Sequence, residues 1–387
     1  MISLERREMR TAAVPSWLVG TISIPLALVA GAALLWSTGQ NPYNVYEEII
    51  TTAFGSTEAL SATLVSMTPL LLTGLCAAVA FRMNLFNIGG EGQLYVGAIA
   101  GAGAGLALHG GGRFIVIVSM VLAGAGGGIL WVAIPAVLKT ALNVNEILSS
   151  LMLNYVAGLL MLYLIFDSRS YWRDVSSPGA QTFPHGKILD TSAWWPQLEV
   201  GGVTFPFGLL VGVGASVILY VLLRSTRFGF RIRVISDSPG AAAYAGFRVG
   251  STTVLVMLLS GALAGLAGAS QVGDFSHILD PEGVQLEMYG YTGIIVAALA
   301  RYSPLGCVIP AFLLGGLNNA ALQLQGPTFP VGLTGTLEGV ILACVVGTEF
   351  LGRYSIRLKR REGEARGKDP NGASGGGARS RTDAMPS

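Results

Sequence analysis

The sequence has few charged residues, few cysteines and few histidines. Only 12% of its 387 residues are Asp, Glu, Lys or Arg, whereas soluble domains contain roughly 25%. The three cysteines, Cys76, Cys307 and Cys344, fall far apart in separate apolar runs, so we interpret them as small packing residues. The three histidines fall in predicted loops and lack the spacing of metal ligands. This composition argues against an ordinary soluble enzyme and against a metal site.

Motifs for chemistry on a substrate are also missing. No GxxxxGK[ST] phosphate-binding loop occurs, and the two Gly-Lys pairs at Gly186 and Gly367 stand in the wrong context. The apolar runs hold no Ser-His pair, no paired carboxylates and no cluster of metal ligands. We therefore expect no catalytic residues, no metal and no cofactor bound by this chain. Movement of a solute is a better hypothesis than its conversion.

Long apolar runs dominate the chain. About 20 consecutive apolar residues form a helix that crosses ~30 Å of hydrocarbon, and runs of this length recur throughout the sequence. We predict an all-α polytopic membrane protein with about ten transmembrane helices, the eighth short enough to be re-entrant. The predicted spans lie near Val14–Trp36, Ala59–Phe81, Leu94–Leu108, Phe114–Leu138, Ile147–Phe166, Thr204–Leu223, Ser251–Gln271, Met288–Ala300, Leu305–Leu322 and Val331–Leu351.

Basic residues predict the orientation of these spans. All but four of the 24 Lys and Arg residues fall on the inside if the N-terminus is cytoplasmic, as the positive-inside rule expects. Ten spans then place both termini in the cytoplasm. We expect a cytoplasmic N-terminus at 1–13, a transmembrane domain at 14–351 with a large external loop at 167–203, and a basic, disordered cytoplasmic tail at 352–387. Tryptophans in the external loop suit a membrane interface or a lid.

The spans could form two inverted repeats. Spans two to five and seven to ten begin on opposite sides of the membrane, an arrangement common in transporters. EGQLYVGAIAG from Glu91 is faintly similar to EGVQLEMYGYTG from Glu282. Small residues at a spacing of four, such as Gly97 with Gly101 and Gly261 with Gly265, predict helices that approach one another closely.

A polar stretch, RMNLFNIGGEGQ (Arg82–Gln93), interrupts the apolar sequence between the second and third spans. Charges near hydrocarbon are costly, and irregular backbone at membrane depth is tolerated only against protein or a water-filled cavity. We therefore predict a shaped break at the cytoplasmic ends of these spans, beside an inner gate. The simpler alternatives are a helix cap or an ion pair between Arg82 and Glu91.

A basic loop at 224–248 is the second informative polar stretch. Ser238 is a good N-cap, Pro239 suits the first helical position, and Ala241–Ala245 favours a helix. Gly246 can close that helix in a left-handed conformation. The loop is either an ordinary connector or a surface that a partner protein grips.

Four segments together resemble permease subunits of bacterial ABC importers. They are FRMNLFNIGGEGQ, VNEILSSLMLNY (Val144–Tyr155), RFGFRIRVISDSPGAAAYAGF and GYTGIIVAALARYSPLG (Gly290–Gly306). The wider superfamily includes the ribose and branched-chain amino-acid permeases. The form FNIG-x-EGQ is most similar to the longer permease of nucleoside importers that work with basic-membrane-protein-type lipoproteins. The resemblance covers roughly residues 40 to 350.

The resemblance implies a multi-pass permease in the bacterial inner membrane. It would move nucleosides or related neutral solutes inward by alternating access, while separate ATPase subunits bind and hydrolyse ATP. The implied partners are those ATPases, a second permease chain in a heterodimer, the lipid bilayer and a substrate-binding lipoprotein received by loop 167–203; no nucleic acid is implied. The 224–248 loop would be the coupling element. Its candidate ATPase contacts are Arg231, Ser238, Pro239, Ala243, Tyr244 and Gly246.

Polar residues at apolar depth are candidates to line the substrate route. Amide side chains both donate and accept hydrogen bonds, which suits a neutral nucleoside better than an ion. Each candidate has the alternative role of a helix–helix hydrogen bond or a cap. The candidates are Asn84, Phe86 (a ring for base stacking), Asn87, Glu91, Gln93, Asn154, Tyr155, Asn318 and Asn319.

Three alternative functions remain at this point. A permease for a simple sugar such as ribose or galactose shares much of the same sequence. An ion-coupled secondary transporter would ordinarily need ionisable residues at mid-membrane, where the predicted spans offer chiefly Glu338. A membrane-embedded enzyme is disfavoured by the missing catalytic set.

Overall fold

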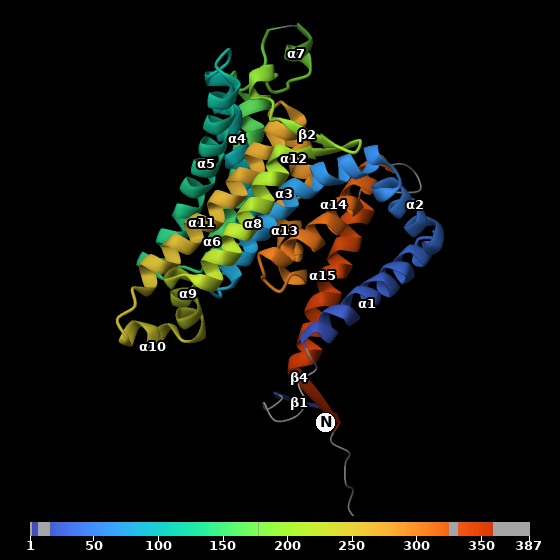
Figure 1. Cartoon of the computed structure of the whole chain (residues 1–387), viewed down its shortest axis with the longest axis vertical. Helices are drawn as coiled ribbons and strands as arrows, with labels where there is room; N and C mark the ends of the chain where they lie inside the picture. Colours follow the sequence, from blue (N-terminus) through green and yellow to red (C-terminus); the bar gives the residue numbers. More distant parts are fainter. Residues whose placement is uncertain (1, 7–15, 177, 325–331, 359–387) are drawn as a thin grey trace, which may run out of the picture. The chain divides into compact units, whose positions relative to one another are not determined.

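The computed structural model describes residues 2–6, 16–176, 178–324 and 332–358, and these are mainly helical (Figure 1). The chain forms two compact units, one of residues 14–349 and one of the two ends, 1–13 and 350–387. The helices are α1 (Ser16–Ser37), α2 (Pro42–Phe54), α3 (Thr57–Phe81), α4 (Gly90–Ala107), α5 (Arg113–Leu142), α6 (Glu146–Leu162), α7 (Pro178–Thr182), α8 (Phe207–Ser225), α9 (Arg227–Asp237), α10 (Pro239–Tyr244), α11 (Val249–Ser270), α12 (Pro281–Glu287), α13 (Tyr289–Leu299), α14 (Val308–Gln323) and α15 (Gly332–Arg353). Short π-helical turns η1 (Tyr163–Asp167) and η3 (Gln271–Ser276) extend α6 and α11, and 3₁₀ turns form η2 (Thr191–Ala193) and η4 (Leu305–Cys307).

The smaller unit contains a two-stranded sheet. Strand β1 (Ile2–Arg6) pairs antiparallel with β4 (Tyr354–Leu358), with Ile2 opposite Leu358. Both segments alternate apolar and polar residues over most of their length, which favours pairing of strands. The expectation of disorder from residue 352 is therefore wrong for 354–358, and the rest of the tail, 359–387, lies outside the described residues.

Six described helices are long and apolar enough to cross a membrane by length and composition. They are Thr57–Phe81, Arg113–Leu142, Glu146–Asp167, Phe207–Ser225, Val249–Ser276 and Leu305–Gln323. Shorter apolar helical stretches occur at Pro25–Ser37 and Gly335–Cys344. The predicted class, a polytopic helical membrane protein, is confirmed. The count of ten spans and their orientation stay predictions.

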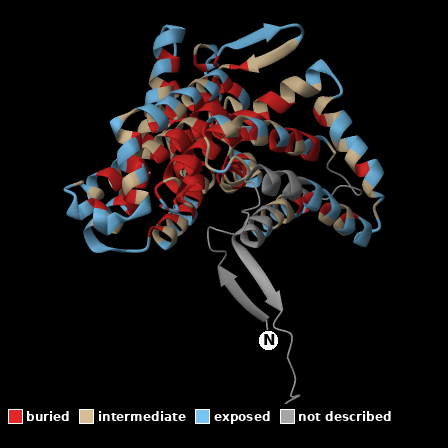
Figure 2. Ribbon diagram, turned by 60° about the horizontal axis from the view of Figure 1, so that its bottom comes forward, coloured by how far each residue is buried: buried red, intermediate tan, exposed pale blue. Residues whose placement is uncertain are grey.

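Helix α3 lies at the centre of the larger unit. Its most apolar window is 94% buried, against 28% for the helix Glu146–Asp167 and 33% for α8. Figure 2 shows the same contrast as a buried interior covered by partly exposed helices. A helix that is apolar on all sides belongs in the interior, whereas the exposed apolar faces of α6 and α8 suit lipid or another membrane subunit.

Glycines bring α4, α5 and α11 into direct backbone contact. A methyl group on Gly97 of α4 would overlap the backbone of Gly265 on α11, and one on Gly128 of α5 would overlap the carbonyl of Gly261. The predicted close packing at four-residue spacing is confirmed in these contacts.

The predicted eighth span, Met288–Ala300, is the short helix α13, and another short helix, α12, precedes it. Helix α12 ends at Glu287 and α13 begins at Tyr289, because Met288 between them adopts a left-handed conformation with φ of 47°. The 11 residues of α13 measure about 16 Å, which is too short to cross the hydrocarbon alone. Residues 274–287, which lie between the seventh and eighth predicted spans, are not a simple loop, since η3 and α12 occupy most of them.

The segment 167–206, which we term the cap, is folded onto the end of the bundle. Its hairpin pairs β2 (Gln197–Val200) with β3 (Val203–Pro206). The amide of Leu189 donates to the carbonyl of His277 at 2.9 Å, that of Trp195 donates to Gly273 at 3.0 Å, and the indole of Trp172 donates to Ile99 at 2.9 Å. The sequence predicted either a membrane interface or a lid for these tryptophans, and the contacts support a lid that packs on protein. Helix α2, which lies between the first and second predicted spans, was not predicted.

Candidate functional site

Helix α4 begins inside the bundle instead of at the end of α3. After Phe81 the chain turns back through residues 82–89, which we term the fold-back, with Asn84 in a left-handed conformation at φ of 54°. Gly90, the first residue of α4, lies beside Cys76, whose sulfur would be 3.7 Å from a methyl group placed there. Cys76 precedes the end of α3 by five residues, or about 7 Å. The polar stretch therefore reaches deeper than its predicted place at the helix ends.

A closed hydrogen-bond network fixes the fold-back. The amide of Asn87 donates to Ser260 Oγ at 2.9 Å and to Gln93 Oε1 at 3.1 Å, and Gln93 Nε2 donates to Asn87 Oδ1 at 2.9 Å. Ser260 in turn donates to the carbonyl of Cys76 at 2.8 Å. Buried amides are stable only when their donors and acceptors are paired. Asn87 and Gln93 therefore bind α4 to α3 and α11.

Glu91 joins the start of α4 to the start of α13. Its side chain is buried, and Oε2 accepts a hydrogen bond from the amide of Gly290 at 2.5 Å, while Oε1 has no hydrogen-bond partner among the described residues. A side chain on Gly290 would overlap the backbone of Glu91. Arg82 donates instead to the carbonyl of Tyr302 at 2.9 Å, so the predicted alternative of an Arg82–Glu91 ion pair is wrong. A carboxylate at a helix start is stabilised by the helix dipole.

The two helices run in opposite directions from this meeting point. Toward its end α4 contacts the cap, where Gly103 lies against Trp172. Helix α13 instead leads to Tyr302, which is bonded to Arg82 just after α3. The helix starts put Gly90 opposite Gly290, with identical residues also at 96 and 296, 98 and 298, and 100 and 300. The faint sequence similarity that aligned Glu91 with Glu282 does not match this structural alignment, because Glu282 lies near the start of α12.

Further polar contacts surround the break at Met288. Asn154 of α6 donates to the carbonyl of Ile88 at 2.9 Å and to the hydroxyl of Tyr291 at 3.1 Å, and its oxygen accepts from the amide of Gly92 at 2.8 Å. Asn154 therefore connects α6 to both of the opposed helices.

Two more carboxylates lie beside the same break. Asn318 donates to Glu287 at 2.6 Å, and Thr292 donates to Glu338 at 2.8 Å. Glu287 and Thr292 were missed by sequence reasoning, which placed the first in a loop and gave no role to the second. The repetition of Gly90 at Gly290, 200 positions apart, is a signal that could have found them.

Four candidates lie away from this group. Tyr155 is 63% exposed. Asn319 donates to the carbonyl of Ala59 at 3.3 Å, near the other end of α3. Phe86 is partly exposed and packs on Phe81. Asn84 is exposed and donates to both oxygens of Ser236 on α9 at 3.1 Å. The group at the break thus unites Asn87, Glu91, Gln93, Asn154 and Asn318.

The basic loop folds into α9 and α10. The predicted caps are confirmed: Ser238 Oγ accepts from the amide of Ala241 at 3.4 Å, Pro239 opens α10, and Gly246 is left-handed at φ of 85°. Ala243 and Arg231 are exposed, and Tyr244 is 98% exposed. The loop therefore presents a small, preformed helical surface.

No group of three or more His, Cys, Asp or Glu side chains is placed to hold a metal ion within the described part of the chain. The described ion pairs are Lys139 with Glu146 at 2.7 Å and His185 with Asp174 at 4.0 Å. The carboxylates at the break bond instead to amide, hydroxyl and backbone donors. This chemistry suits a neutral polar solute.

Residues 59–346 match the protein family described as the permease component of the branched-chain amino acid transport system. The chain is similar to the guanosine ABC transporter permease protein NupP of Bacillus subtilis, with 32% identity over 88% of this chain and 94% of the relative. It is also similar to the glucose ABC transporter permease protein TsgB13 of Haloferax volcanii, with 32% identity over 95% and 97%. The nucleoside ABC transporter permease protein NupB of Lactococcus lactis is 28% identical over 84% and 89%.

Proposed function

Because the chain belongs to the family of permease components of branched-chain amino acid transport systems, we propose that it carries nucleosides inward as the membrane permease of an ABC importer. Family membership confirms the resemblance that the sequence motifs indicated. The chain is a multi-pass membrane protein and a transport component, not an enzyme, and ABC permeases work with ATPase subunits. ATP is then bound and hydrolysed on those subunits.

The meeting of α4 and α13 at Glu91 is the observation that carries this proposal. Two helices that start inside an apolar bundle and run in opposite directions are typical of substrate sites between inverted repeats. Here the start is surrounded by amide and hydroxyl groups, such as those of Asn154 and Tyr291. A nucleoside offers matching donors and acceptors without a net charge. Similarity to a guanosine permease and a nucleoside permease supports this substrate class.

The coupling proposal follows from contacts along the fold-back. Helix α10 would dock into an ATPase through Ala243 and Tyr244, both exposed. Helix α9 is bonded to Asn84 through Ser236, and the fold-back leads directly from Asn84 to Glu91. A displacement of α10 would therefore reach the Glu91–Gly290 contact through a short and continuous path. Opening and closing of that contact would alternate access.

The remaining partners are proposed from the surface. The exposed apolar faces of α6 and α8 would meet lipid and a second permease chain in a heterodimer. The cap would receive a substrate-binding lipoprotein on the external side of a bacterial inner membrane. The orientation with both termini in the cytoplasm belongs to this proposal.

A permease for a simple sugar is the second candidate, because the glucose permease is also 32% identical. The deciding experiment is uptake of tritiated guanosine by the complete complex in liposomes with and without ATP. We expect ATP-dependent uptake that uridine and adenosine inhibit and that ribose and glucose do not. Inhibition by sugars alone would favour the sugar permease. Uptake that persists after the ATPase is inactivated would indicate an ion-coupled carrier and contradict both candidates.

A further inference from the structure

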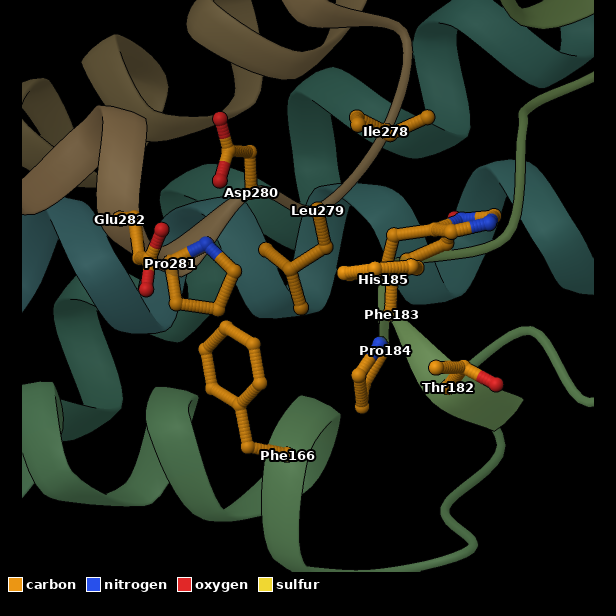
Figure 3. Close-up of a pocket in the computed structure, with 11 residues that line it drawn as sticks. Phe166, Thr182, Phe183, Pro184, His185, Ile278, Leu279, Asp280, Pro281 and Glu282 are labelled. Atoms are coloured by element: carbon orange, nitrogen blue, oxygen red, sulfur yellow. The ribbon is translucent and has the colours of Figure 1, made fainter. Parts of the chain in front are cut away.

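A cavity of about 300 Å³ opens between the cap and the start of α12 (Figure 3). Its walls come from three separate segments: Phe166 of η1, residues 182–186 of the cap, and residues 278–282, which lead from η3 into the first turn of α12. The volume lies at the lower end of the range for small-molecule sites. The cavity is distinct from the polar group at Met288.

The middle of the cavity is apolar and aromatic. In Figure 3 the ring of Phe166 faces the ring of Pro281 and the side chain of Leu279, with Pro184 beside them. Phe183 adds a second aromatic ring and is 77% exposed. Flat apolar surfaces of this kind bind planar heterocycles by stacking, and such stacking tolerates any base.

The two sides of the cavity carry polar groups. Asp280 and Glu282 lie on one side of the apolar surface, and His185 lies on the other. Asp280 occupies the N-cap position of α12, yet its side chain makes no capping hydrogen bond, so its carboxylate is available to a ligand. Carboxylates accept hydrogen bonds from the hydroxyls of ribose in dinucleotide sites. The cavity thus combines a surface for a base with acceptors for a sugar.

The walls are held together before any ligand arrives. A methyl group on Gly186 would lie 2.5 Å from the carbonyl oxygen of Leu279, so the cap and the opposite wall are in backbone contact. The Leu189–His277 hydrogen bond closes the same junction. Phe166 belongs to π-helical η1, and π-helical η3 precedes the opposite wall; turns of this type are frequent at functional sites. A preformed site loses little free energy to ordering when it binds.

We propose that this cavity is a receiving subsite for a nucleoside, with the base stacked on Phe166 and Phe183 and the ribose hydroxyls donating to Asp280 and Glu282. The inference rests on the proposed function, since it takes the transported solute to be a nucleoside. Helix α12 runs from the cavity to the break at Met288, and its seven residues measure about 10 Å. The subsite holds the solute after its release from the binding protein, one short helix away from the polar group.

The test compares variants in the complete reconstituted complex. Phe183→Ala combined with Asp280→Asn removes a ring and a charge without disturbing the core, because Phe183 is exposed and Asn is as good an N-cap as Asp. We expect ATP-driven uptake of tritiated guanosine at limiting concentration to fall at least ten-fold, with ATPase association unchanged. Matched controls are Phe114→Ala, at an 80% exposed ring at the start of α5, and Glu199→Gln, on exposed β2.

Photolabelling with 8-azidoadenosine supplies a second measurement. We expect it to modify peptides containing residues 166–186 or 278–282 in the wild-type complex, and excess guanosine to protect them. If the wild type takes up guanosine while the double variant matches its controls and these peptides stay unlabelled, the subsite is overturned and the proposed function stands. If the wild type takes up no nucleoside, the proposed function fails and the subsite fails with it.

Discussion

The cap and the basic loop flank the same helix, α8, but they are built in opposite ways. The basic loop at 224–248 forms its helices through contacts within itself, such as the bond that the amide of Ala241 donates to Ser238 Oγ, and it joins the fold-back through the bond of Asn84 to Ser236. The cap is held by bonds to residues far away in the sequence, among them Leu189 to His277 and Trp172 to Ile99. A self-contained loop can move as a unit with a partner. The cap is instead fixed to the bundle and forms one wall of the cavity beside α12.

The largest expected effect is the loss of ATPase binding when the basic loop, but not the cap, is altered. Ala243→Asp places a carboxylate on the exposed surface of α10, where docking of an ATPase would have to desolvate it. We expect the ATPase to be lost on purification and ATP-driven uptake to fall at least 100-fold. The matched change in the cap, Gln181→Asp, also at an exposed position, should leave ATPase association unchanged. Normal assembly of the Ala243→Asp variant would show that α10 is an ordinary connector.

A smaller effect should come from breaking the attachment of the cap. Gly186→Ala places a methyl group 2.5 Å from the carbonyl oxygen of Leu279, a contact that backbone atoms cannot avoid without moving. We expect limited proteolysis within 167–206 to accelerate at least ten-fold while the ATPase stays bound. The control is Gly240→Ala in α10, because a methyl group at Gly240 would meet no atom within 4 Å outside its own stretch of helix. Equal cleavage rates in the two variants would mean that this junction does not hold the cap.

A milder response is expected when the basic loop loses the N-cap residue of α10, because the contacts of that residue are local. Ser238→Ala removes the acceptor for the amide of Ala241, and N-cap replacements of this type cost about 1 kcal/mol. We expect amide hydrogen exchange in α10 to accelerate about five-fold, with exchange in the cap unaltered. Ser149→Ala is the control, because that hydroxyl donates back to its own helix. A change that spreads to 167–206 would contradict the independence of the two regions.

The smallest effect is a dependence on pH confined to the cap. Burial lowers the pKa of His277, whose ring stacks on Trp194 at 4.2 Å. His277 therefore binds a proton more readily when the cap is detached from it than when the cap is attached. The attachment of the cap at His277 becomes less stable as the pH drops below about 6.5. After correction for the intrinsic exchange rate, which itself falls as the pH drops, the Leu189 amide, which donates to the carbonyl of His277, should be less protected at pH 5 than at pH 8. His277→Phe should flatten this profile, and an unchanged profile would exclude His277 as its cause.

The comparison also shows what the sequence could predict. The helical class and most helix positions follow from apolar runs, and Ser238, Pro239 and Gly246 follow from capping rules that act within a few residues. The break at Met288 does not, because its left-handed position is occupied by a methionine and not by a glycine. The attachment of the cap does not either, since its hydrogen bonds join residues separated by about 70 to 90 positions.

The candidate site was predicted unevenly for a related reason. Asn87, Glu91 and Gln93 stand out because they are polar between apolar runs, and the structure places all three in the buried group. Tyr155 and Asn319 are equally polar, but only the neighbouring helices decide which way they face. Glu287 was missed because its helix, α12, resembles an acidic loop. Periodicity identifies a helix more readily than it identifies the neighbour of each side chain.

The glycine contacts among α4, α5 and α11 have a mechanical consequence. Their backbones interlock so closely that a shift along the axes would drive one helix into another, and these three helices must therefore travel as one stiff body. Any hinge in a transport cycle has to lie elsewhere. The junction of the short helices α12 and α13 at Met288 is the natural place for it. Helices α12 and α13 would move about Met288, and the body formed by α4, α5 and α11 would stay fixed.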